Sequence, residues 1–143
     1  MNELLEAVRK ALSEGMPEIR DVFIATDEQV LPAGARLPCI GIKDGTIKTR
    51  KLTCGVTEKT LQLSIIAWSP QGKDAAQVTG DPTQPGVVQM IRDIEDVLDE
   101  NMLSIVGMTY AGPVEEAESR LFINKQNKTI QQKIIIFEYE RER

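Results

Sequence analysis

The sequence contains no histidine, so the side chain most often used as a general base and as a transition-metal ligand is missing. Aromatic residues make up only 4% of the 143 residues, which leaves few rings on which nucleotide bases could stack. Basic residues are also in deficit, because 22 acidic residues outnumber 17 basic ones and give a net charge of -5. These shortages argue against histidine-dependent enzymes and against general nucleic-acid binders, whose surfaces carry a basic surplus.

Motifs that cradle phosphates or activate a nucleophile are missing as well. The sequence has no G-x-x-x-x-G-K-[ST], no G-x-G-x-x-G and no G-x-S-x-G, and its two cysteines do not form a C-x-x-C pair. An enzyme would have to use carboxylates, lysines, Tyr110 or Tyr139, and no arrangement of these groups can be named. We therefore expect no catalytic residue, no cofactor and no metal.

No stretch approaches the roughly 18 apolar residues of a membrane span, and residues 1–6 lack the basic and apolar segments of a signal peptide. We expect a protein that is made in the cytoplasm and is not embedded in a membrane. Its two cysteines should then be free thiols in a reducing compartment.

Strand pairing leads to the same expectation for the thiols. Asp44-Gly45 favours a tight hairpin turn, which sets Cys39 opposite Arg50. Cys54 then lies about 13 Å along the strand from that partner, at about 3.3 Å per residue, too far for a disulfide with Cys39.

Two segments have the apolar periodicity of surface helices. Residues 2–14 place one apolar stripe between charged positions before Gly15 and Pro17. The second segment, residues 87–98, has an apolar side opposite an acidic side. The apolar residues are Val87, Val88, Ile91, Ile94 and Leu98.

Strand patterns fill most of the remaining chain. Residues 21–25 form a short strand, and residues 118–123 and 129–139 form a hairpin. The segment 58–68 alternates and becomes apolar on both sides toward its end, as in a central strand that is covered twice. The sequence predicts one α+β domain over residues 1–143, with a small antiparallel sheet, two helices packed on it and a protruding hairpin.

Opposite charges are segregated along the chain. The hairpin arm is basic through Lys43, Lys48, Arg50 and Lys51. The second helix is acidic through Asp93, Asp96, Asp99 and Glu100. Both sets are consistent with solvated surfaces. A further acidic group, Glu115, Glu116 and Glu118, is consistent with protection of a strand edge against unwanted pairing. The alternative hypothesis is that the basic arm of one copy meets the acidic helix of the next, which would join copies head to tail into a ring.

Trp68 and the Pro- and Gly-rich loop 69–86 can be interpreted in three ways. A tryptophan at the end of a central strand usually closes the core, but here it could also anchor a partner on a loop that orders on binding. A third interpretation makes the loop a lid over a small-molecule pocket near Trp68, in a cytosolic regulatory domain.

The order and size of these elements resemble the tail-terminator family of long-tailed phages. The resemblance spans Met1 to Arg143 and rests on the segments 4–12, 58–68, 87–98 and 129–139 rather than on a motif. It implies a homo-hexameric ring in the virion that caps the tail tube and docks the head or neck, with the tail tube protein and a head-completion protein as partners. It implies no catalytic residue and transfers no functional position.

Related roles remain open at this point. A head-closure or neck adaptor, or a tail-tube-like subunit, would have the same element order. Sequence-specific nucleic-acid binding is not expected, but an acidic ring lumen would let DNA pass because it repels phosphates.

Overall fold

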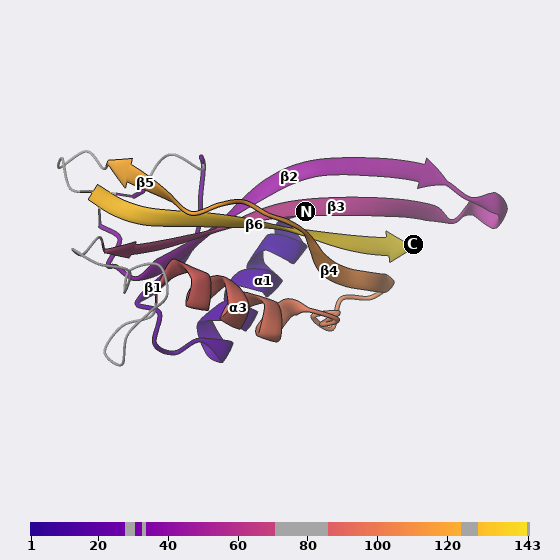
Figure 1. Cartoon of the computed structure of the whole chain (residues 1–143). Coiled ribbons are helices and arrows are strands. Elements are labelled where there is room, and N and C mark those ends of the chain that lie inside the picture. The colour runs from indigo at the N-terminus through magenta and orange to yellow at the C-terminus, as the bar shows by residue number, and fades with distance from the viewer. Residues whose placement is uncertain (28–30, 33, 71–85, 124–128, 143) are drawn as a thin grey trace.

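The computed structural model describes residues 1–27, 31–32, 34–70, 86–123 and 129–142. Within these residues it contains two α-helices and one six-stranded mixed sheet that is not closed. Both helices lie on the same face of the sheet, and strands β2 and β3 extend beyond the other strands (Figure 1). The predicted α+β class is confirmed.

The two helices follow the predicted periodicity. Helix α1 (Asn2–Gly15) buries Leu4, Leu5, Val8 and Leu12 against the sheet. Helix α3 (Val87–Leu98) buries Val87, Met90, Ile91, Ile94 and Leu98. In both helices the charged residues lie on the other side, because only the apolar stripe gains free energy by leaving water.

The strand order in the sheet is β1-β2-β3-β6-β4, and the short β5 also pairs with β6. All pairs are antiparallel except β1 with β2, which is parallel. The expected purely antiparallel sheet is therefore wrong for this one pair. The strands are β1 (Asp21–Ile24), β2 (Cys39–Lys51), β3 (Thr57–Pro70), β4 (Met108–Glu116), β5 (Arg120–Ile123) and β6 (Thr129–Glu142).

The expected hairpin turn at Asp44-Gly45 is wrong. Strand β2 runs through this dipeptide for 13 residues, with a bulge between Asp44 and Ile47, and pairs with β3 along its length. A Cβ on Gly45 would lie 2.6 Å from the Gln62 carbonyl oxygen, so this glycine permits a close approach of two strands rather than a turn.

The chain reverses instead at the 3₁₀ turn Thr53–Gly55, where Cys54 and Gly55 adopt φ of 66° and 75°. As a result Cys39 lies opposite Trp68, not Arg50. Both cysteines are free thiols, as expected, although the predicted register was wrong.

Strand β4 was not predicted. Gly112 and Pro113 interrupt its pattern, and they are tolerated because β4 lies at the edge of the sheet and hydrogen-bonds to β6 alone. Strands β4 and β5 follow one another along β6, separated by a break at residues 117–119. Together they form one lateral edge of the sheet.

The core has two parts because the sheet is covered on both faces near β1. On the helix side, the cluster includes Leu61, Leu63, Ile65 and Ala67 of β3. On the other side, Ile66 and Trp68 pack with Cys39, Ile130 and Ile134. The prediction that the end of this central strand is apolar on both faces is confirmed. We call the sheet face opposite the helices the open face.

Candidate self-assembly surfaces

The distal halves of β2 and β3 form a basic arm, defined here as residues 43–62 (Figure 1). Residues that lie opposite each other on neighbouring strands point to the same side of a sheet. Lys43 pairs with Ser64, Lys48 with Thr60 and Arg50 with Glu58, and these pairs share the open face; Lys51, opposite Thr57, lies on the other side. Three of the four predicted basic residues are therefore brought together.

Two of these cations have an ion partner within the arm. The Arg50 Nη2 atom lies 3.5 Å from Glu58 Oε1, and Lys43 Nζ lies 3.8 Å from Asp44 Oδ1. In each pair one partner is exposed and the other is half-buried, so water screens the attraction and each pair contributes at most about 1 kcal/mol to folding. Such weak pairs leave the cations available to an incoming carboxylate.

The predicted acidic residues lie along the outer side of α3 and just beyond it. Asp93 accepts a 2.8 Å hydrogen bond from Gln89 Nε2, whereas Asp96 and Asp99 are exposed. Glu100 follows the helix with φ of 57°, and its backbone N–H donates to the Ala111 carbonyl of β4. The acidic helix is thereby held against the β4 strand.

Glu95 of α3 lies among these carboxylates and shows how the acidic residues are grouped. Partial burial, and then the negative charges of Glu116, Asp99 and Asp96, raise the pKa of its carboxyl, with Arg92 opposing. A carboxylate of β4 is therefore close enough to repel one of α3. The acidic surface extends from the helix onto the end of β4.

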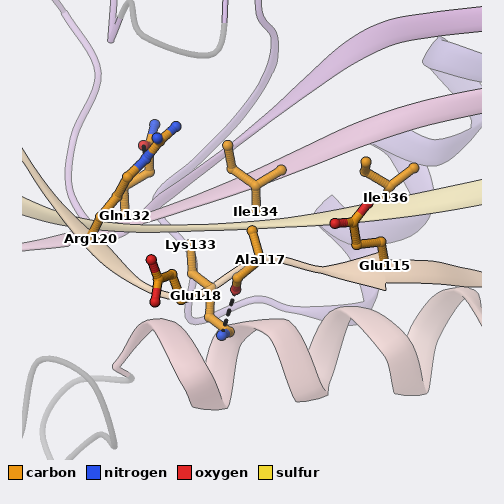
Figure 2. A pocket seen from close by; sticks show the side chains of 8 residues that line it. All are labelled: Glu115, Ala117, Glu118, Arg120, Gln132, Lys133, Ile134 and Ile136. Atoms are coloured by element: carbon orange, nitrogen blue, oxygen red, sulfur yellow. Dashed lines mark hydrogen bonds between the residues drawn. The ribbon is translucent and has the colours of Figure 1, made fainter.

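Three glutamates, Glu115, Glu116 and Glu118, lie at the junction of β4 and β5. Lys133 of β6 reaches this junction from the helix side and donates a 2.8 Å hydrogen bond to the Ala117 carbonyl (Figure 2). Its Nζ atom also lies 3.8 Å from Glu116 Oε1. Glu115 and Glu118 are exposed. The prediction assigned these glutamates to edge protection and left them out of the interface set, because the strand that carries them was not recognised.

A pocket of about 330 Å³ opens at the same junction. Its lining combines both charges with three apolar side chains, those of Ala117, Ile134 and Ile136. Gln132 and Ile134 project from one side of β6, and Lys133 projects from the other (Figure 2). Trp68 does not line this pocket. No group of three or more His, Cys, Asp or Glu in the described part of the chain is placed to hold a metal.

Trp68 lies in the core, with none of its surface exposed. Its ring stacks on Phe23 at 5.7 Å between centroids and 14° between planes. The side chain is therefore packed inside the protein and is not presented to a partner. Most of the predicted loop 69–86 lies outside the described residues, so neither the docking-loop nor the lid hypothesis is tested.

The two thiols should differ sharply in reactivity. Burial, reinforced by the negative charge of Asp21, raises the pKa of Cys39 to about 12, while Cys54 is exposed at the tip of the arm. At pH about 8, where a free thiol is partly ionised, we expect one fast-reacting thiol per folded chain and two in denaturant. A chromogenic disulfide reagent measures both counts, and Cys54→Ser is the control that should remove the fast reaction. Fast modification of Cys39 in folded Cys54→Ser would contradict its burial.

Among the described residues, no helix is long and apolar enough to cross a bilayer.

Comparison with known proteins gives a likeness in structure but none in sequence. No protein-family model and no curated protein matches the chain. Its fold is similar to that of a chain in the solved structure described as "Virion of native gene transfer agent (GTA) particle". The sequence identity is 10%, the TM-score is 0.52, and the match covers 95% of this chain and 96% of that chain. The two chains therefore share one fold over nearly their whole lengths.

Proposed function

We propose that this protein is a structural component of a phage-type virion and, more specifically, a non-enzymatic tail terminator. The observation that carries the proposal is the likeness of nearly the whole chain to a chain of the gene transfer agent virion, with no large extra segment on either side. The resemblance of the element order to tail terminators supports the same role. Fold alone does not imply function, so the role has to be tested on assembly.

In this role, copies of the chain form a ring, a hexamer, that closes the end of the tail tube. The partners are further copies of the chain, the tail tube protein and a head-completion or neck protein. Segregated surface charge supports head-to-tail association, since the arm is basic at Lys48 and Arg50 and the junction of β4 and β5 is acidic at the exposed Glu115 and Glu118.

The first test is whether the chain caps a polymerising tail tube. We expect a ring by light scattering and electron microscopy, and tubes that stop growing when the protein is added to tube subunits. Tubes that lengthen by incorporating the chain would indicate a tube-like subunit instead. Binding to the head-completion protein without any effect on tubes would indicate a neck adaptor. If the chain is missing from purified particles of its phage, the proposal is wrong.

A further inference from the structure

Exposed apolar side chains are confined to two edges of the sheet. Six large apolar residues of the described chain are exposed, from 40% for Ile24 to 77% for Val106. Ile24 and Ile47 lie on β1 and β2 at one edge. The other four lie on or beside β4 and β5 at the opposite edge; they are Val106, Tyr110, Val114 and Leu121. Isolated exposed apolar residues are ordinary, but their restriction to two edges indicates two contact surfaces.

We call these surfaces the β2 edge, comprising β1 and residues 43–51, and the β4 edge, comprising residues 106–121. They are opposite in charge. The β2 edge carries four cations, Lys43, Lys48, Arg50 and Lys51, against two anions, Asp21 and Asp44. The β4 edge carries three glutamates against Arg120, whose Nε already donates a 3.2 Å hydrogen bond to Gln132. Charge and apolar surface thus coincide at both edges.

The register of the sheet sets the charges of the two edges at matching heights. Residues in one cross-strand row lie at the same level along the strands. The two rows that matter run across β2, β3, β6 and β4 on the open face: Lys43, Ser64, Ile136, Glu115; and Lys48, Thr60, Glu140, Tyr110.

A second copy placed edge to edge in the plane of the sheet would continue these rows. Strand β4 runs antiparallel to β6, and β6 runs in the same direction as β2, so β2 of one copy would lie antiparallel to β4 of the next. With the two edges in side-chain contact, Lys43 would reach Glu115 of the neighbour, and Lys48 would reach Tyr110 and Glu140.

Neither edge is suited to a continuous hydrogen-bonded ladder. Pro113 has no N–H to donate, and β4 shifts register between Met108 and Tyr110 and between Pro113 and Glu115. Strand β2 is bulged between Asp44 and Ile47. Such features block indiscriminate strand pairing, so specificity has to come from side chains.

We infer that the β2 edge of one copy binds the β4 edge of the next copy, head to tail, through the Lys43–Glu115 and Lys48–Tyr110 rows with apolar contacts between them. This inference rests on the proposed ring and names its interface. According to this inference, the basic arm binds the β4 edge of the next copy and not the outer side of its α3.

Two charge-reversed variants test this contact. Lys43→Glu with Lys48→Glu makes the β2 edge acidic, and Glu115→Lys with Glu118→Lys makes the β4 edge basic. Each variant alone opposes like charges, and we expect its dissociation constant to rise at least tenfold, roughly the effect of 1.4 kcal/mol. An equal mixture restores opposite charges at every contact, so alternating assemblies of the wild-type mass should form. Light scattering over a dilution series measures both results.

The control is Asp96→Lys with Asp99→Lys, an equal charge change on exposed residues of α3. We expect this variant to assemble like the wild type, and thermal unfolding should show that all three variants are folded. The inference is overturned if the α3 variant loses assembly while the edge variants keep it, or if the mixture stays dissociated. A mixture that stops at dimers would show a two-fold contact instead of a head-to-tail one.

The inference and the proposed function can fail separately. A wild type that remains monomeric up to its solubility limit overturns the edge contact in solution, yet it would still cap tubes if the proposed function holds. A ring that forms through these edges but neither caps tubes nor occurs in particles would support the edge contact and exclude the terminator role. Raised salt should weaken the wild-type assembly, because it screens the charged rows.

Discussion

Replacing Trp68 by alanine is expected to lower the free energy of unfolding by about 3–5 kcal/mol, the usual cost of emptying a buried aromatic site. The cost should lie in the upper part of this range because Trp68 is fully buried and stacks on Phe23. Its cluster on the open face is small, so few neighbours can move in to fill the space. Chemical denaturation followed by circular dichroism measures the change.

Trp68→Phe is the matched control. It keeps an aromatic ring beside Phe23 and removes an indole N–H that is buried without a hydrogen-bond partner among the described residues. Because no hydrogen bond is lost, we expect this variant to retain more than half of the stability that alanine removes. If Trp68→Ala were as stable as the wild type, the open-face cluster would not be a core.

The same experiment distinguishes core closure from partner anchoring. A residue that anchors a partner lowers affinity when it is truncated and leaves the stability of the free chain nearly unchanged. The structure predicts the reverse for Trp68, since its ring touches its own chain on all sides. Assembly measured at a temperature where Trp68→Phe is fully folded should match that of the wild type.

Gly107→Ala is expected to cost about 2–4 kcal/mol, from a left-handed backbone conformation together with a steric clash. Gly107 has φ of 84°, and a Cβ there would run into the carbonyl oxygen of Glu142 in β6. Backbone atoms of a paired strand cannot rotate away as a flexible side chain can. The 2.9 Å hydrogen bond from the Glu142 N–H to the Gly107 carbonyl would be strained as well.

Gly55→Ala separates these two causes. Gly55 has a similar φ of 75°, but nothing lies within 4 Å of the Cβ position, so alanine there should cost only about 1–2 kcal/mol. The excess cost at Gly107 then reports the contact with β6. Equal losses at the two glycines in urea denaturation would mean that the clash with Glu142 is relieved without cost.

Gly107 lies in the segment that positions the start of the β4 edge, so its contacts matter for the proposed interface as well as for stability. The segment between α3 and β4 has positive φ at Glu100, Leu103 and Ser104 as well, and Arg141 Nε donates a 2.9 Å hydrogen bond to the Val106 carbonyl. Backbone conformations of this kind persist only where surrounding contacts hold them. They place the exposed Val106 at the start of the β4 edge.

Local patterns in the sequence were sufficient to predict the two helices and the central strand. The composition alone was sufficient to argue against histidine-dependent chemistry. An amphipathic helix is specified by residues three and four apart, and the two faces of β3 by alternate residues, so a short window contains the signal. The acidic side of α3 and the basic arm could be located for the same reason. Charged residues on exposed faces occupy the polar positions of these periodic patterns, so the patterns remain readable in the sequence.

Only the tertiary structure decided how the strands pair and which charges meet. Asp44-Gly45 has the local chemistry of a turn, yet β3 offers a hydrogen-bonding partner along the whole of β2, and long-range pairing overrides the local preference. Strand β4, with Gly112 and Pro113, is a strand because β6 pairs with it. That pairing sets Glu115 level with Lys43, residues 72 positions apart in the sequence, and no local pattern contains this information.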